Sequence, residues 1–265
     1  MSELFFVGVG LCDEKDLSRR ALETLADCPV VFAETYTSEL RAGSLERLAV
    51  ELGRPITVLG RAELEEERTL RAALERYPRV ALLVVGDPFA ATTHVAVRVA
   101  VESWGHRWHY LPNASALTAV PGLLGLMPYR FGRTVSFSFA VPGFSPRSPL
   151  EMIGRNRAAG LHSLVLLDLD PVRHAYLSPQ EAIRTLSGTG SEDPLGLPAE
   201  AELAVVARVG HPDEAAFLGR ATELSAVDFG PPLHALVVPA PELHFQEEAA
   251  IARWRVAPRP PSKPV

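Results

Sequence analysis

The chain has 265 residues, of which 47% are hydrophobic and 22% charged, and its net charge is −6. This composition is typical of a soluble globular protein with a full core, and the length favours two domains over one. No apolar run approaches the ~18–20 residues that span a bilayer, and the start lacks the basic region of a signal peptide. No basic stripe is present either, so composition argues against a membrane or nucleic-acid partner.

The chain contains two cysteines, Cys12 and Cys28. They stand apart from any Cys/His spacing that binds zinc, and no H-E-x-x-H pattern occurs, so we predict no metal site. Because nothing suggests a disulfide scaffold, we expect two reduced thiols and a cytoplasmic location.

The first part of the chain alternates between strand and helix signals. Strand-like runs occur at 4–7, 29–33, 56–59, 80–85 and 108–111, and helical periodicity at 17–25, 45–52, 70–74 and 93–104. The run 80–85 is continuously apolar, as in a parallel strand covered on both faces. Regular alternation of this kind predicts an α/β domain with a mostly parallel sheet over residues 1–112.

The second part predicts another α/β domain, over residues 113–256, with a mixed sheet. Its expected strands are 134–139, 163–167, 203–207 and 235–238, with helices at 116–126, at 152–159 and after Ser178. Ser178, Pro179 and Glu181 occupy the N-cap, N1 and N3 positions that start a helix. Residues 187–202 read as a loop, and the proline-rich basic tail 257–265 is expected to be disordered.

Two glycine-containing motifs follow predicted strands, at the end where open α/β sheets bind their ligands. Gly8-Val9-Gly10 would allow a ligand or another backbone to come close, or form a plain turn. Asp13 occupies the position of the third glycine of a dinucleotide fingerprint, so the NAD signal is weak. Gly86-Asp87-Pro88 is a good turn sequence, and Asp87 would alternatively offer a carboxylate to a ligand. His94, His162 and His234 lie beside apolar segments and are expected to be hydrogen-bonded core residues.

A series of motifs in the same order along the chain resembles the diphthine synthase family, within the tetrapyrrole-methylase-like class of methyltransferases. The likeness runs from about residue 4 to 247, and it rests on the segments 8–17, 32–38, 86–94, 113–115, 129–132, 160–168 and 228–239. Gly86-Asp87-Pro88 through Ala91-Thr92-Thr93-His94 is its most specific motif. The resemblance implies two α/β domains with a cofactor cleft between them, and a homodimer.

The family's activity implies that S-adenosyl-L-methionine is the methyl donor and S-adenosyl-L-homocysteine the product. The implied acceptor is the amino group of the 3-amino-3-carboxypropyl histidine of translation elongation factor 2, and trimethylation to diphthine is the favoured outcome. By matching position, the cofactor would contact Leu11, Asp87, Ala90, Ser115, Ala116, Leu167, Val209 and His234. Cys12 and the small Ala90 and Ala116 depart from the usual pattern, which bears on the fine shape of the site.

No residue is singled out as a general base for the acceptor amine. Glu34, Tyr36, Asp168 and Asp170 are polar groups at predicted strand ends, where structural hydrogen bonds are the more frequent role. Desolvation alone would also lower the amine pKa. Two alternative functions stay open: methylation of a tetrapyrrole on the same fold, and a non-catalytic binding module.

Overall fold

The computed structural model describes residues 1–139, 147–170, 173–188 and 197–256. Contacts between Cα atoms divide the chain into two units. Unit 1 comprises Met1–Leu117 with Leu169–Ala175, and unit 2 comprises Thr118–Asp168 with Tyr176–Val265. The predicted disordered tail, 257–265, lies outside the described residues.

Unit 1 contains a five-stranded sheet in the order β3-β2-β4-β1-β5. Its strands are β1 (Glu3–Gly8), β2 (Val30–Glu34), β3 (Ile56–Leu59), β4 (Arg79–Val84) and β5 (Arg107–Leu111). The helices between them are η1 (Glu14–Asp16), α1 (Arg19–Ala26), α2 (Ser44–Leu52), α3 (Arg61–Glu65), α4 (Arg68–Arg76) and α5 (Val95–Ser103). All pairs of neighbouring strands are parallel, so the five carboxyl ends lie at one edge of the sheet.

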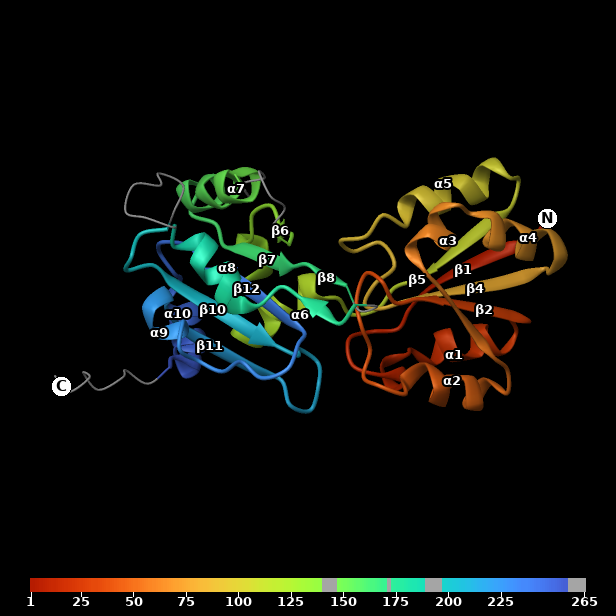
Figure 1. Cartoon of the computed structure of the whole chain (residues 1–265), viewed down its shortest axis with the longest axis horizontal. Helices are drawn as coiled ribbons and strands as arrows, with labels where there is room; N and C mark the ends of the chain where they lie inside the picture. Colours follow the sequence, from red (N-terminus) through yellow and green to blue (C-terminus); the bar gives the residue numbers. More distant parts are fainter. Residues whose placement is uncertain (140–146, 171–172, 189–196, 257–265) are drawn as a thin grey trace. The chain divides into compact units, whose positions relative to one another are not determined.

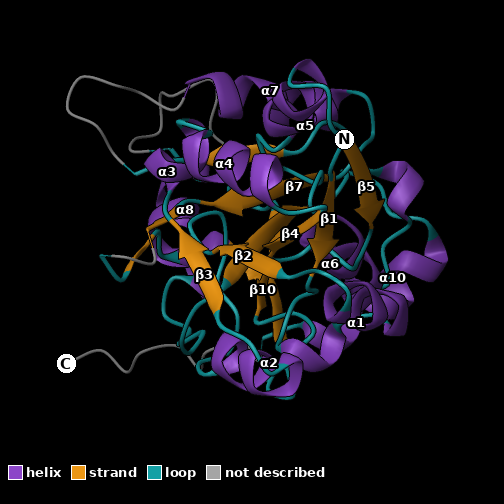
Figure 2. Ribbon diagram, turned by 90° about the vertical axis from the view of Figure 1, so that its right-hand side faces the viewer, coloured by secondary structure: helices purple, strands orange, loops and turns teal. Residues whose placement is uncertain are grey.

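The side chains of the central strands alternate between two apolar layers. In β1, Phe5 and Val7 belong to the core that includes α1 and α2, whereas Leu4 and Phe6 belong to the core that includes α3, α4 and α5. Figures 1 and 2 show these two groups of helices on opposite faces of the sheet. Burial on both faces explains why the central strands are continuously apolar in sequence.

Unit 2 contains a five-stranded sheet in the order β11-β10-β12-β7-β6. Its strands are β6 (Val135–Phe137), β7 (Ser163–Leu167), β10 (Glu202–Ala207), β11 (Ala215–Arg220) and β12 (His234–Val238). The pair β6–β7 is parallel and the other pairs are antiparallel, which confirms the predicted mixed sheet. A separate two-stranded ladder joins β8 (Leu169–Asp170) to β9 (Ala175–Tyr176).

The helices of this part of the chain are α6 (Ala116–Leu124), η2 (Pro128–Arg130), α7 (Arg147–Ala158), α8 (Pro179–Leu186), α9 (Ala221–Leu224), α10 (Phe245–Ile251) and η3 (Ala252–Trp254). The predicted start of α8 is confirmed. Ser178 Oγ accepts a hydrogen bond from Glu181 N at 3.2 Å, and the Glu181 carboxylate accepts one from Ser178 N at 3.1 Å. This reciprocal pair satisfies two amides that a helix start otherwise leaves unbonded.

Several short elements were not expected from the sequence, among them α3, β8, β9, α9 and α10, and two further differences concern β11 and the division between units. The strand β11 was not predicted, because its segment Ala215–Arg220 mixes small residues with only two large apolar ones. The division between units falls after Leu117 instead of after Pro112, and Leu169–Ala175 groups with unit 1. The later division has a local cause, because Asn113 is still hydrogen-bonded to the sheet of unit 1.

Candidate functional site

Two glycine turns meet at the carboxyl edge of the unit 1 sheet. Gly10 follows β1 with φ of 89° and Gly86 follows β4 with φ of 75°. Their backbones exchange two hydrogen bonds, Gly10 N to Gly86 O at 3.2 Å and Gly86 N to Gly10 O at 2.7 Å. A Cβ atom added to Gly8 would lie only 2.7 Å from Gly86 O. The glycines therefore let the two turns pack closely against each other at this edge of the sheet.

Asp87 organises the residues around these turns. Its Oδ2 accepts hydrogen bonds from Tyr110 Oη at 2.6 Å and Asn113 N at 3.1 Å, and its Oδ1 accepts one from Phe89 N at 3.0 Å. Burial and the hydrogen bond to Asp87 raise the pKa of Tyr110 to about 12, so the phenol keeps its proton and donates. A carboxylate has about four acceptor sites, and these three hydrogen bonds use most of them.

Asn113 and Asp16 fix the loop that carries Leu11. The Asn113 side-chain amide donates to Gly8 O at 2.9 Å and to Asp16 O at 3.0 Å. Asp16 Oδ2 in turn accepts from Leu11 N at 2.9 Å and Cys12 N at 2.8 Å. Sequence patterns did not single out these two supporting residues, although Asn113 lies in a family-like motif and Asp16 in another.

The five predicted cofactor residues of this unit gather at the same edge: Leu11, Asp87, Ala90, Ser115 and Ala116. Ala90 N donates to Asp87 O at 3.2 Å, and a Cβ added to Gly86 would lie 4.0 Å from Ser115. Leu11, Ala90 and Ala116 are half-buried, whereas Asp87 and Ser115 are buried. Small, partly accessible side chains next to close backbone turns suit a ligand bound mainly through main-chain groups and apolar contact.

The other three predicted residues gather at one edge of the unit 2 sheet. Leu167 ends β7, Val209 follows β10, and His234 begins β12 opposite Ala207 of β10. His234 Nε2 lies 3.4 Å from the Phe229 carbonyl, so this nitrogen carries the hydrogen and donates it. Burial lowers the pKa of His234, which leaves the ring neutral near pH 7.

Arg208 supports this second group. Its backbone has a φ of 51°, and its amide donates to Leu233 O at 2.7 Å. The guanidinium donates to Phe229 O at 3.1 Å and pairs with Asp213 at 2.7 Å. Arg208 therefore ties the turn after β10, which carries Val209, to the segment that enters β12.

The three carboxylates among the possible bases accept hydrogen bonds or form ion pairs within the structure. Glu34 is buried and accepts hydrogen bonds from Tyr36 N and Thr37 N, each at 3.1 Å, and from the Thr37 hydroxyl. Asp168 accepts one from Phe139 N at 3.3 Å, and Asp170 pairs with Arg173. These contacts favour the structural role that was expected.

The Tyr36 phenol keeps its proton near neutral pH. Burial and the nearby Glu34 carboxylate raise the pKa of its phenol, although Arg61 and a hydrogen bond with Thr93 oppose the shift. The Arg61 guanidinium lies 5.2 Å from the centre of the Tyr36 ring. A phenol in this setting can orient a polar group and has no tendency to act as a base at neutral pH.

The three histidines named from sequence are hydrogen-bonded. His94 and His162 are buried and His234 is half-buried. His94 Nδ1 lies 3.1 Å from Pro88 O, and Ala240 N donates to His162 Nδ1 at 2.8 Å. Among the described residues, no cluster of three His, Cys, Asp or Glu side chains has a metal-binding arrangement.

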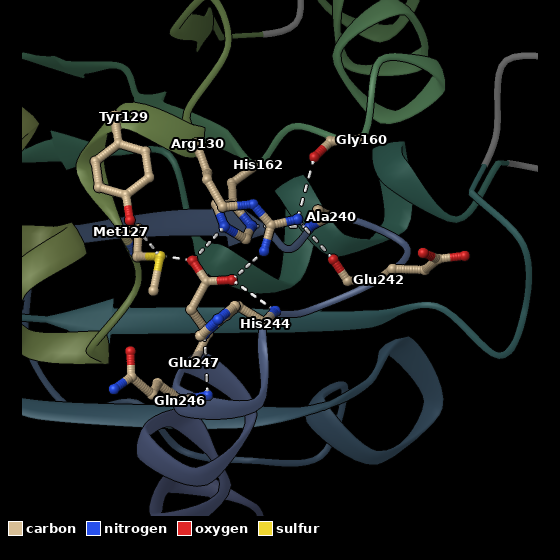
Figure 3. Close-up of polar contacts among 10 residues, drawn as sticks. All are labelled: Met127, Tyr129, Arg130, Gly160, His162, Ala240, Glu242, His244, Gln246 and Glu247. Carbon is tan, nitrogen blue, oxygen red and sulfur yellow. Dashed lines mark hydrogen bonds and ion pairs between the residues drawn. The ribbon is translucent and has the colours of Figure 1, made fainter.

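Unit 2 contains a buried ionic cluster that no sequence pattern indicates (Figure 3). Glu247 is fully buried and pairs with Arg130 and with His162 Nε2, the latter at 3.0 Å. It also accepts hydrogen bonds from Met127 N at 2.9 Å and His244 N at 3.0 Å. His162 precedes β7, whose other end carries Leu167, so this cluster lies away from the predicted cofactor residues. Its role is to join η2, β7 and α10.

The chain is similar to known proteins in both sequence and fold. The family model described as "Tetrapyrrole (Corrin/Porphyrin) Methylases" matches residues 3–225. A diphthine synthase from Methanothermobacter thermautotrophicus is 40% identical over 97% of both chains, and one from Methanocella arvoryzae is 37% identical over 94% of this chain and 96% of its own. A crystal structure of a diphthine synthase is 34% identical, covers 97% of each chain and has a TM-score of 0.86.

Proposed function

Because this chain belongs to the diphthine synthases, which are S-adenosylmethionine-dependent methyltransferases, we propose that it methylates the 3-amino-3-carboxypropyl histidine of elongation factor 2. The product would be diphthine, formed by transfer of three methyl groups to the amine. The observation that carries the proposal is 40% identity to a diphthine synthase across 97% of both chains. We further propose a cytoplasmic homodimer. Among the described residues, no helix has the length and apolar character needed to cross a membrane.

We propose that the eight residues named from sequence contact the cofactor. For unit 1, support comes from the hydrogen-bonded turns that bring Leu11, Asp87 and Ala90 to one edge. For unit 2, support comes from the strand register that brings Leu167, Val209 and His234 to one edge. Parallel sheets bind ligands at the carboxyl ends of their strands, and the unit 1 group occupies that position.

The chemistry follows from what these residues can do. S-adenosylmethionine supplies a methyl group already activated by the sulfonium charge. The protein has to bind, align the acceptor amine and exclude water. Glu34 is too buried to reach an acceptor, and the Tyr36 phenol keeps its proton. We therefore assign no general base, and we propose that desolvation lowers the amine pKa before each transfer.

The decisive experiment uses labelled S-adenosylmethionine with elongation factor 2 that carries the unmethylated intermediate. We expect label on the factor, and mass spectrometry of the modified peptide should show three added methyl groups. Fewer groups would correct the extent of methylation. Label on a porphyrinogen instead of the factor would establish tetrapyrrole methylation. Cofactor binding without transfer to either acceptor would indicate a non-catalytic binding module.

A further inference from the structure

His94 lies between two turns that follow neighbouring strands of unit 1. One turn, residues 34–37, follows β2, and the other, the loop 86–93, follows β4 and carries Asp87 and Ala90. The His94 side chain is 1% exposed, so it cannot reach a ligand in solvent. Both of its ring nitrogens nevertheless face polar groups on these turns.

The hydrogen bonds assign the two nitrogens. Nδ1 lies 3.1 Å from the Pro88 carbonyl, which only accepts, so Nδ1 carries the hydrogen and donates it. Nε2 lies 3.7 Å from Glu34 Oε1, within ion-pair reach but beyond a hydrogen bond. Among the described residues, Nε2 has no hydrogen-bond partner. A buried polar atom of this kind is rare and calls for a role that an apolar side chain could not fill.

The other ring nitrogen, Nδ1, acts on the loop 86–93. The Pro88 carbonyl accepts from His94 Nδ1 and also from Thr92 Oγ1 at 2.7 Å. Ala91 sits in the left-handed region with φ of 56°, a conformation that a residue with a Cβ atom adopts only when its surroundings impose it. Both bonds span Ala91, because Pro88 precedes it and Thr92 and His94 follow it, so they help to impose the shape of the loop.

The same imidazole faces the other turn. Glu34 shapes residues 34–37 by accepting from Tyr36 N and Thr37 N. The Tyr36 ring meets the His94 ring edge-on, with 6.3 Å between the ring centres. Contacts from both turns therefore converge on His94.

We propose that His94 is a positioning residue for cofactor binding, whose Nδ1–H holds the Pro88 carbonyl and keeps the loop 86–93 in its binding shape. The proposal rests on the proposed function, because it takes Asp87 and Ala90 as cofactor contacts. His94 acts through the loop and does not touch the cofactor. Its neighbour Glu34 completes the arrangement by fixing the turn against which the ring packs.

Two substitutions separate the ring nitrogens. His94→Asn retains a side-chain N–H near the position of Nδ1, whereas His94→Gln places its polar group near Nε2. We expect His94→Asn to bind S-adenosylhomocysteine nearly as well as the unchanged protein in calorimetry. We expect His94→Gln to bind it roughly tenfold more weakly, which corresponds to one lost hydrogen bond. At saturating acceptor, His94→Gln should raise the KM for S-adenosylmethionine by a larger factor than it lowers kcat.

Hydrogen exchange of the ligand-free protein tests the anchoring itself. Amides of the loop 86–93 should exchange faster in His94→Gln than in His94→Asn. His106→Gln is the matched control, because His106 precedes β5 at the other end of the sheet and accepts a hydrogen bond from Ser2 N. Equal cofactor affinity and equal exchange in both His94 variants would overturn the proposal. An unchanged protein that binds no S-adenosylmethionine would instead refute the proposed function, while exchange would still decide the anchoring.

Discussion

Replacing Glu247 by glutamine should destabilise unit 2 by about 3 kcal/mol, the lower end of the range for breaking a buried ion pair. The glutamate is fully buried between Arg130 and His162 (Figure 3). Glutamine removes the negative charge, and its –NH2 group, which is a donor, then faces either Arg130 or His162, which are donors as well. The loss stays at the lower end because the Arg130 side chain is 24% exposed and water can solvate it.

Urea unfolding measures this loss, and hydrogen exchange assigns it to a unit. Peptides from β7 and α10 should lose protection, whereas peptides from β4 in unit 1 should not. Glu248→Gln is the matched control, since Glu248 is the next residue of α10 and is exposed. Its effect should stay within about 0.5 kcal/mol. A Glu247→Gln protein as stable as the control would refute the reasoning.

The same cluster predicts acid sensitivity. Burial opposes ionisation of Glu247, but the amides of Met127 and His244 and the nearby His162 overcome it and lower its pKa. Burial lowers the pKa of His162, and Glu247 only partly offsets this. Both folded-state pKa values lie below their unfolded values, so stability is complete above about pH 6.5, the ordinary histidine value. The free energy of unfolding should fall first as the pH drops through the histidine range, and again as the pH drops below the ordinary glutamate range. The second decrease should be absent in Glu247→Gln.

Gly10→Ala should cost about 1–3 kcal/mol more than Gly105→Ala in urea unfolding: both glycines have positive φ, but an added Cβ meets a side chain at 2.4 Å at Gly10 and nothing within 4 Å at Gly105. Equal costs would contradict the close packing of this turn. In an alkaline titration, Tyr110→Phe and the unchanged protein should show the same tyrosinate absorbance up to about pH 11, because burial and a hydrogen bond raise the pKa of Tyr110 to about 12. A difference near pH 10 would refute this. Arg208→Lys should cost about 1.5–3 kcal/mol of stability, because an ammonium cannot replace the fork that reaches Asp213 and two carbonyls. A fully stable variant would show these bonds to be dispensable.

Much of unit 1 could be predicted because its signals are local. The run 80–85 is apolar throughout, and it forms the central strand β4, buried on both faces. The start of α8 was equally readable, since Ser178 and Glu181 satisfy each other's backbone amides within four residues. Hydrophobic period and capping chemistry depend on near neighbours in the chain, so sequence carries them.

The supports of the candidate site depend on distant neighbours, and sequence could not supply them. Asp87 was noticed as a turn residue, but its hydrogen bonds with Tyr110 and Asn113 arise only when β4 and β5 are brought together on either side of β1. Glu247 read as one more acidic residue of a helix. Its burial against His162 follows from a pairing across 85 positions of sequence.

The order of strands in unit 1 has a consequence for how the chain is made. β1 leaves the ribosome before the other four strands of its sheet, yet it pairs with β4 and β5, which are synthesised much later. The apolar residues Leu4–Val7 therefore wait without a sheet partner while the intervening segments emerge, a period of exposure to chaperones and to aggregation. The arrival of β4 ends this interval, because β4 pairs with both β1 and β2 and joins the two parts of the nascent sheet.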